Sequence, residues 1–482
     1  MFPTIAWNLI SLELFAVLTL VTLVVMDIVL PKDTRKDWLG FVSFAALGGM
    51  IIFWLTQRNL AGSTFGGTFV MDSLAWFFEG FFLLTMVFVF TMTQQFFKSL
   101  GSRRHEFYFL LWLALIGMCL IASSGDFLLL FIAIEILTIS LYVMTAYLKS
   151  DTHSIEAGMK YLILGSLASG FFLYGMSFLY GATRSTHFDV IQGFVNTNAM
   201  TPATAFGLVL IFVAVGFKIA AVPFHMWVPD VYQGAPTPVT ALLSVGSKAA
   251  GFVILMRLFF GIFAGWHMEW HLILAVLSAV TMTYGNLVAM FQTNIKRLLG
   301  YSSISHAGYL LMGAAAGTTL GAAGMNFYLL GYLFTNLAAF LVIVLFYIAN
   351  KSDELADYAG LAKRSGILAT TLLLALVSLA GLPPLAGFFG KFTLLMATVK
   401  DGYLWLALIA AVNIVISTYY YLVVAKRIFA DAPRTTTPIP VSLPMRLVLG
   451  FAILGIIGIG IFQGPFLNAA MTAVQGMYLI TP

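Results

Sequence analysis

Four ionisable residues lie inside long apolar stretches of this sequence, where a charge is costly. They are one carboxylate, Glu135, and three amines, Lys218, Lys248 and Lys391. A charge at the centre of a membrane helix costs about 2.5–3.5 kcal/mol, so such residues persist where they face an interior cavity and contact one another. An amine removed from water holds its proton less tightly, and a nearby carboxylate strengthens that hold. Because neighbouring amines repel, a proton arriving at one tends to expel another, and the set predicts a proton relay.

His306 is a fifth candidate, because it follows the small polar run Tyr301 to Ser305 inside an apolar segment. An imidazole can pass protons near neutral pH, although a hydrogen-bonded packing histidine is the alternative interpretation. For the charged set, the alternatives are a purely structural Glu–Lys pair and lysines that extend to a membrane interface. A metal site is not expected, because ammonium groups repel cations.

The composition indicates what kind of structure must hold these residues. Of the 482 residues, 61% are hydrophobic and only 9% are charged, against about 25% charged in a soluble domain. The mean hydropathy of +0.99 excludes a soluble enzyme, a nucleic-acid-binding protein and a disordered chain. The single cysteine, Cys119, cannot form an intrachain disulfide or hold an iron–sulfur cluster, and we predict that it is a small buried residue.

The apolar residues fall into about fourteen segments, each near the length of about 20 residues that a membrane crossing needs. Such segments must be helices, because only a helix satisfies its own backbone without water. The sequence therefore predicts an all-α polytopic membrane protein. The segments are 8–30, 38–57, 74–96, 106–123, 125–147, 157–181, 203–230, 238–262, 271–290, 297–316, 324–349, 366–398, 402–429 and 445–468.

The basic residues of the loops gather on one side of this arrangement, as the positive-inside rule requires. Loops after segments 1, 3, 5, 9, 11 and 13 hold most of them, and only Arg58, Arg184, Arg257 and Lys400 fall on the other side. Both termini are therefore expected outside. Lys160 and Arg257 lie near segment ends and are expected to extend to the interface. Glu13, Asp27 and Glu79 are also interpreted as interfacial.

Two segments, the seventh and the twelfth, are longer than a crossing requires and contain internal prolines. The seventh holds Pro223 and Pro229, and the twelfth holds Pro383 and Pro384. Proline removes a backbone donor and clashes one turn back, so both helices should be broken within the membrane. Broken backbone at that depth is tolerated only where it is buried in protein or lines a wet cavity. The breaks near two of the intramembrane lysines therefore predict an ion path.

An internal repeat is also indicated, because segments 4–8 and 9–13 each place a long, proline-broken segment fourth. An offset of five helices reverses orientation, so the two halves would form an inverted repeat. We divide the chain into residues 1–100 (helices 1–3), 101–265 (the first repeat), 266–432 (the second repeat) and 433–482 (helix 14 and tail).

Three stretches of the sequence resemble the antiporter-like membrane subunits of the proton-pumping NADH:quinone oxidoreductase, respiratory complex I. They are residues 224–239, 294–306 and 381–392. The sequence Asp-Val-Tyr-Gln-Gly-Ala-Pro at residues 230–236 resembles the N type of that family more than its L and M types. The resemblance covers essentially all of the predicted segments.

The resemblance implies roles for the five candidates. Glu135 and Lys218 correspond to a pair that controls the input half-channel, Lys248 corresponds to the central relay, and Lys391 to the terminal residue on the output side. It also implies no cofactor in this chain, with FMN, iron–sulfur clusters and quinone in partner subunits. Subunits K and M would be its neighbours, nucleic acid would not be a partner, and a bacterial inner membrane with both termini on the periplasmic side would be its location.

Three functions follow from this sequence. The first is a proton-translocating subunit of a redox-driven translocase, with no redox site in this chain, which takes its driving energy from quinone reduction in its partners. The second is a subunit of a Mrp-type cation/proton antiporter, which would use the same lysines. The third is a structural scaffold that carries vestigial charges.

Overall fold

The all-helical architecture predicted from the sequence is confirmed by a computed structural model, which describes residues 5–29, 38–100 and 105–477. Two compact units divide the chain. Unit 1 comprises the described residues up to Ile219, together with Gly246–Glu269 and 472–477, and unit 2 comprises Ala220–Val245 and Trp270–Met471. Cys119 is buried, as expected.

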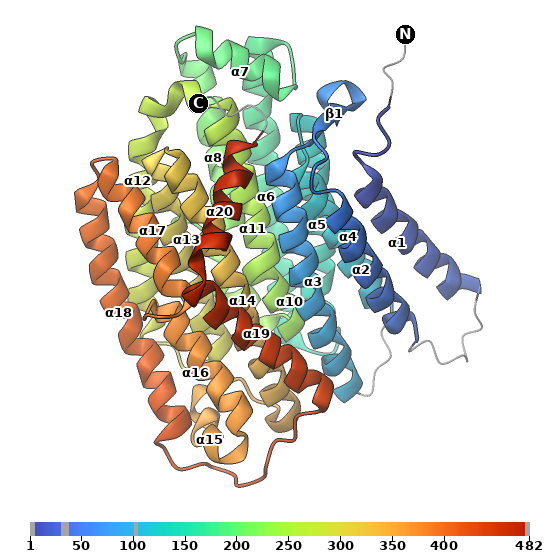
Figure 1. Ribbon diagram of the computed structural model, residues 1–482, viewed down its shortest axis with the longest axis vertical. Helices are drawn as coiled ribbons and strands as arrows, with labels where there is room; N and C mark the ends of the chain where they lie inside the picture. The colour runs from blue at the N-terminus through green and yellow to red at the C-terminus, as the bar shows by residue number, and fades with distance from the viewer. Residues whose placement is uncertain (1–4, 30–37, 101–104, 478–482) are drawn as a thin grey trace. The chain divides into compact units, whose positions relative to one another are not determined.

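Unit 1 is built around long helices from the first half of the chain (Figure 1). The elements are α1 (Ser11–Val29), α2 (Trp38–Thr56), β1 (Gly62–Thr64), η1 (Phe65–Gly67), β2 (Phe69–Met71), α3 (Ser73–Ser99), α4 (Glu106–Ala122), α5 (Phe127–Thr145), α6 (Thr152–Thr183), α7 (Phe188–Thr197), α8 (Pro202–Ile219), α11 (Lys248–Leu255), the π-helical η3 (Met256–Ile262) and η4 (Ala264–Trp266).

Unit 2 holds most of the remaining helices. The elements are α9 (Trp227–Gly234), α10 (Thr237–Leu242), α13 (Ile295–Ala316), α14 (Thr319–Asn350), η5 (Leu355–Tyr358), α15 (Leu361–Arg364), α16 (Gly366–Ala380), α17 (Ala386–Lys400), α18 (Leu404–Phe429) and α19 (Leu443–Ile461). Three further elements cross the boundary between the units in sequence: the π-helical η2 (Leu243–Ser247), α12 (His267–Ala289) and α20 (Gln463–Gln475).

Every apolar segment predicted from the sequence contains a helix. Among the described residues, eleven helical spans are long and apolar enough to cross a membrane by length and composition. The predicted count is larger because α4 and α16 are shorter apolar helices and α13 carries Lys296, Arg297 and several serines. Fourteen crossings and the inverted repeat therefore stay predictions, as does the division of the chain at residues 100, 265 and 432.

Both predicted helix breaks are present. The seventh segment is divided between α8 and α9, and the twelfth between α16 and α17. The polar stretches between segments hold elements that the hydropathy pattern does not indicate, because they are too short and too polar to register in it. These are the hairpin of β1 and β2, with Ser63 opposite Val70, and the short helix α7.

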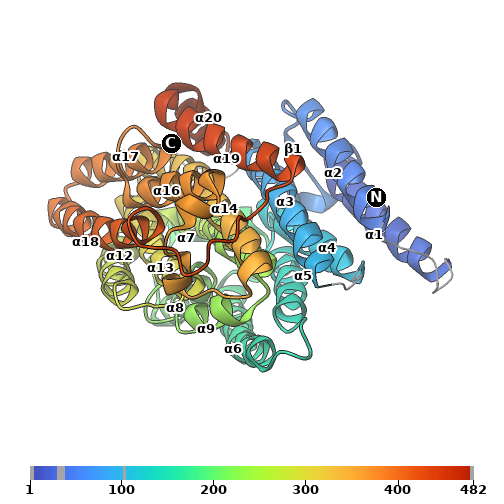
Figure 2. The same cartoon turned by 90° about the horizontal axis from the view of Figure 1, so that it is seen from below.

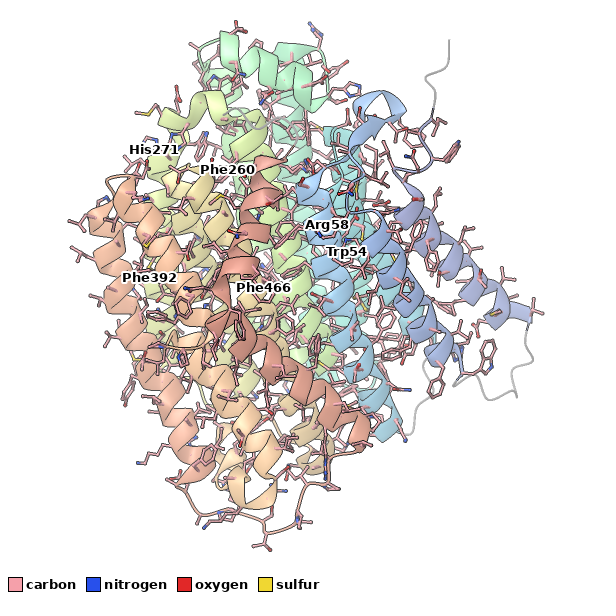
Figure 3. The ribbon with its side chains drawn as sticks, in the orientation of Figure 1. Trp54, Arg58, Phe260, His271, Phe392 and Phe466 are labelled. Atoms are coloured by element: carbon pink, nitrogen blue, oxygen red, sulfur yellow. The ribbon has the colours of Figure 1, made fainter. Side chains whose placement is uncertain are left out.

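The first helices of unit 1 are joined by aromatic packing. Figure 2 shows α1 and α2 beside α3 and α4. Trp54 on α2, labelled in Figure 3, stacks on Trp76 of α3 with ring centroids 4.5 Å apart. Each indole N–H donates to the backbone carbonyl of the other tryptophan, at 2.8 and 3.2 Å. This reciprocal pair satisfies both indoles inside an apolar interface, where an unpaired N–H would be costly.

Arg257 corrects one of the sequence-based expectations. Its side chain does not extend to an interface: it is 4% exposed, and its two terminal nitrogens donate to the carboxylate of Asp72 at 2.6 and 2.8 Å. The position of Arg257 near the end of a segment did not predict its exposure, because the fold places the carboxylate of Asp72 within its reach. Lys160 is 43% exposed and pairs with Glu156 one turn earlier, as an interfacial lysine can.

The interpretation of Glu13 and Glu79 as interfacial is also wrong. Glu13 is 3% exposed and Glu79 is fully buried. Both lie in the first two turns of helices that pack against other helices of unit 1, and this packing keeps them from water despite their nearness to segment ends. Asp27 is partly exposed and contacts His105 at 2.8 Å.

Candidate proton-transfer residues

The first helix break places Lys218 at the end of α8. The ring of Pro223 clashes with the carbonyl four residues back, which belongs to Ile219, and Pro223 has no N–H to bond to that carbonyl. The helix accordingly ends at Ile219, and Ala220 adopts a left-handed φ of 65°. Lys218 is therefore one residue from the helix end, closer than the proline's own position in the sequence suggests.

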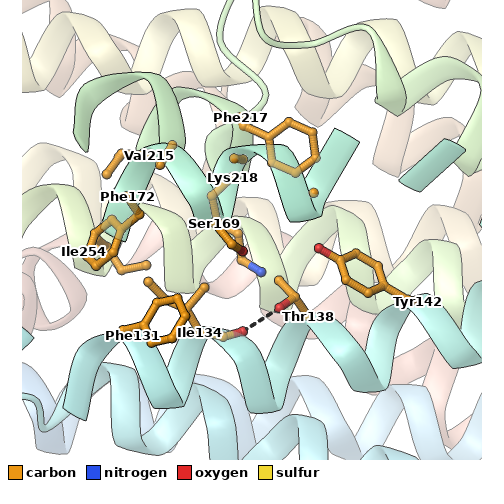
Figure 4. Close-up of a pocket in the computed structure, with 13 residues that line it drawn as sticks. Phe131, Ile134, Thr138, Tyr142, Ser169, Phe172, Val215, Phe217, Lys218 and Ile254 are labelled. Carbon is orange, nitrogen blue, oxygen red and sulfur yellow. Dashed lines mark hydrogen bonds between the residues drawn. The ribbon is translucent and has the colours of Figure 1, made fainter. Parts of the chain in front are cut away.

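Beside the amine of Lys218 lies a cavity of about 30 Å³, shown in Figure 4. Its lining is mostly apolar, with Thr138 of α5 and Ser169 of α6 among the few hydroxyl groups, and the amine points into it. Lys218 is 6% exposed, and its Nζ has no hydrogen-bond partner among the described residues. A space of this size holds about two water molecules.

Glu135 lies on α5, one turn before Thr138. Ser169 donates a hydrogen bond to its carboxylate. Within the described part of the chain, no ion pair within 4.0 Å joins Glu135 and Lys218. Ser169, the residue that orients the carboxylate, was missed by the sequence analysis because serines are frequent on α6 and none carries a distinguishing pattern.

Lys248 is the first residue of α11 and is 2% exposed. It follows the π-helical turn η2, a local irregularity that often marks a functional site. One turn later, Gly251 lets α8 approach closely: a Cβ at this position would lie 3.1 Å from Cγ of Lys218. Unit 1 therefore brings together the helices that carry Glu135, Lys218 and Lys248.

The second helix break supplies the hydrogen-bond acceptors of Lys391. Pro383 and Pro384 have no N–H, so the carbonyls of Leu379 and Ala380 lose the donors that a continuous helix would give them. Nζ of Lys391, five residues into α17, donates to these two carbonyls at 2.8 and 3.1 Å. The prolines thus do more than interrupt the helix: they free the two acceptors that hold the amine.

Two further residues shape the Lys391 site. Nζ of Lys391 lies 4.7 Å above the ring of Tyr309, a cation–π distance. Gly381 has a φ of +87°, and a Cβ there would lie 2.9 Å from Cδ of Lys391. Glycine is therefore required at this position both by the backbone conformation and by the approach of the lysine stem.

We expect Gly381→Ala to destabilise the protein by about 1–3 kcal/mol, the range for a strained backbone residue, and to lower proton transport by displacing Lys391. Gly450→Ala is the matched control, because a Cβ at that helical glycine meets nothing within 4 Å. Thermal unfolding and proton transport of the two purified variants provide the measurement. Equal behaviour of the two variants would contradict the importance of the Gly381 contact.

His306 on α13 is 2% exposed and sits among tyrosines from three helices. Its Nδ1 bonds the hydroxyl of Tyr328 on α14, and its Nε2 lies 3.2 Å from the hydroxyl of Tyr421 on α18. Tyr421 in turn bonds the hydroxyl of Ser302. Each ring nitrogen thus faces a group that both donates and accepts, which is what transfer of a proton through an imidazole requires.

Tyr309 connects the surroundings of His306 and Lys391 within unit 2. It lies one turn after His306, with ring centroids 6.1 Å apart, and its ring also lies beneath the amine of Lys391. The i, i+3 spacing of His306 and Tyr309 was a signal available in the sequence. Tyr328 and Tyr421 gave no such signal, because they reach His306 from other helices.

Histidine, cysteine and acidic side chains do not gather into a group in the described part of the chain. Among residues 5–29, 38–100 and 105–477, no group of three or more His, Cys, Asp or Glu side chains could hold a metal ion. The five candidate residues are distributed as three in unit 1 and two in unit 2. Glu135 is half-buried in the middle of α5, and the other four are buried.

Known proteins that are similar to this chain match it over most or nearly all of its length. The family model described as NADH:quinone oxidoreductase/Mrp antiporter matches residues 124–417, more than half of the sequence. The curated NADH-quinone oxidoreductase subunit N of Moorella thermoacetica is 38% identical over 98% of this chain and 99% of its own length.

Solved structures agree with that match. A chain of respiratory complex I from Thermus thermophilus has a TM-score of 0.82 and 32% identity, and the match covers 95% of this chain and 98% of that one. A chain of the Mrp complex from Dietzia sp. has a TM-score of 0.86 at 22% identity, covering 97% of each chain, and therefore shares the fold.

Proposed function

The chain belongs to the NADH:quinone oxidoreductase/Mrp antiporter family, and we propose on this premise that it is the N-type, proton-translocating membrane subunit of a NADH:quinone oxidoreductase. Near-full-length similarity to a curated subunit N and to a chain of respiratory complex I supports this function. The chain is thus a subunit of an oxidoreductase.

The observation that carries the mechanism is the state of Lys218. A buried amine without a hydrogen-bond partner, beside a cavity with room for about two waters, is arranged to exchange a proton. Water in this cavity would join the amine to the groups around Glu135. When the carboxylate is close, it favours the ammonium form; when it withdraws, the amine releases its proton.

We propose that protons move from the Glu135–Lys218 region to Lys248 and leave through the region of His306 and Lys391. In unit 1, the contact of α8 with Gly251 of α11 links the helices of the first two lysines. In unit 2, Tyr309 contacts both His306 and Lys391. Repulsion between charged amines drives each step, because neighbouring ammonium groups cannot both be stable in a medium of low polarity.

Energy for this transport would come from partner subunits. We propose that FMN, iron–sulfur clusters and quinone are held by those partners, that K and M are the neighbours of this chain, and that it acts as part of a translocase without a redox site of its own. The proposed location is a bacterial inner membrane, with both termini on the periplasmic side and fourteen crossings arranged around an inverted repeat.

A Mrp-type cation/proton antiporter is the second candidate, because the Dietzia Mrp chain shares the fold. The two functions differ in their partners. Purification of the tagged chain from its native membrane in a mild detergent should yield flavin- and iron–sulfur-containing subunits, detected by absorbance and mass spectrometry. Recovery with antiporter subunits and no flavin or iron–sulfur protein would favour the Mrp-type function.

A further inference from the structure

Two buried carboxyl groups in unit 1 take no part in the proposed relay. Glu13 lies in the first turn of α1 and Glu79 in the second turn of α3. They are 3% and 0% exposed, and their carboxyl groups are within hydrogen-bonding reach of each other. The hydroxyl of Ser123, which caps the C-terminus of α4, lies 3.3 Å from Oε1 of Glu79 and donates to it.

A count of donors shows what this cluster lacks. Both carboxyl oxygens of Glu13 and Oε2 of Glu79 are buried without a hydrogen-bond partner among the described residues. Ser123 provides one donor for four oxygens. A carboxylate is only an acceptor, whereas a protonated carboxyl group is also a donor. One proton held between the two groups supplies the missing hydrogen bond and removes the repulsion of two adjacent negative charges.

The titratable groups around the pair do not replace that proton. Asp72 and the buried thiol of Cys119 are its acidic neighbours. The charge of Asp72 is already matched by Arg257, which binds it through two nitrogens. Helix α2 contains no titratable residue. No lysine or arginine is therefore left, among the described contacts of the pair, to neutralise a second carboxylate.

A bound metal cation is a poorer explanation of the cluster. Cations such as Na⁺ and Ca²⁺ take several oxygen ligands, and hard divalent ions take six or more. The cluster offers two carboxyl groups and one hydroxyl, in apolar surroundings, and the described residues form no three-ligand acidic group. A proton needs only two carboxyl oxygens within hydrogen-bonding reach of each other.

We propose that Glu13, Glu79 and Ser123 form a proton-binding site that is separate from the lysine relay. At neutral pH the two carboxyl groups share one exchangeable proton, which changes their total charge from −2 to −1. Ser123 stabilises the charge that remains by donating to Glu79. The site would bind and release a proton within α1, α3 and α4, on helices that carry none of the five relay candidates.

Infrared spectroscopy of the purified, intact complex tests this site. The unaltered protein should show a carboxylic-acid carbonyl band at neutral pH that moves to lower frequency in D₂O. Glu13→Gln and Glu79→Gln should each abolish that band, because an amide donor allows the remaining carboxylate to ionise. Glu156→Gln, which alters an exposed carboxylate on α6, should leave it unchanged.

Three results would overturn the proposal. They are the absence of the band in the unaltered protein, its persistence at half amplitude in either single glutamine variant, and its loss on adding Na⁺ at constant pH. The second result would indicate two independent protonated acids, and the third a cation site. If a glutamine variant does not assemble, Ser123→Ala tests the site instead, because it keeps both carboxyl groups. The carbonyl band should then shift in position, and an unshifted band would contradict the assignment.

Discussion

Replacing Lys218 by alanine is expected to reduce electron-coupled proton pumping by about a hundredfold or more, the lower end of the loss that follows removal of an acid–base group. The amine is buried, has no hydrogen-bond partner among the described residues and points into a water-sized cavity. Without it, no group at the end of α8 can accept a proton from the Glu135 region. Proton uptake per electron, measured in proteoliposomes of the intact complex, gives the effect.

Two further substitutions separate charge from packing at this position. Lys218→Met keeps the stem that packs against Gly251 of α11 and removes the amine. Its proton pumping should therefore be as low as that of the alanine variant. Lys218→Arg keeps a charge that does not titrate and should also fail, because a relay must release its proton. Lys160→Ala is the control, since this lysine is 43% exposed. Normal pumping in the alanine and methionine variants would indicate a scaffold with vestigial charges.

The long apolar helices and the buried lysines could be predicted because each depends on a strong local signal. Twenty apolar residues in a row must form a helix in a membrane, and a proline in the interior of such a run interrupts the helix. For Lys391, the sequence also held the signal for its hydrogen-bond acceptors. Pro383 and Pro384 free the carbonyls of the residues four positions before them, and Lys391 donates to both.

What could not be predicted are contacts between helices distant in sequence. Nothing in the local pattern indicates that Tyr328 and Tyr421 would bond the same histidine, or that Arg257 would reach Asp72 across 185 residues. The same limit explains the errors at Glu13 and Glu79. Hydropathy locates a residue along its own helix, whereas burial depends on the neighbours that the fold supplies.

Arg257→Met is expected to have the second large effect, a loss of about 3–5 kcal/mol in stability, because it leaves the buried carboxylate of Asp72 without its counter-ion. The side chain of Arg257 also donates through Nε to the carbonyl of Ala122 at 2.9 Å. That carbonyl ends α4 and has no partner within its own helix, while Asp72 caps the start of α3. One arginine therefore joins the ends of two helices to η3.

The contribution of an ion pair to stability depends on how exposed the pair is to water. A second, more exposed ion pair in the chain provides the comparison with Arg257 and Asp72. Arg297 and Asp230 are 2.7 Å apart, a similar separation, but their side chains are 31% and 35% exposed. Arg297→Met should therefore cost about 1 kcal/mol or less, because water replaces the lost partner. Thermal unfolding of both variants in detergent measures the difference.

The double variant Arg257→Met/Asp72→Asn should be more stable than the sum of its single changes predicts, since it leaves no unpaired charge. Strict additivity would show that Arg257 acts through packing and its bond to Ala122, with the charge of Asp72 irrelevant. A coupling of more than about 1 kcal/mol would show that the ion pair itself fixes η3 to the ends of α3 and α4. Because η3 continues directly from α11, that attachment would also hold the helix on which Lys248 is placed.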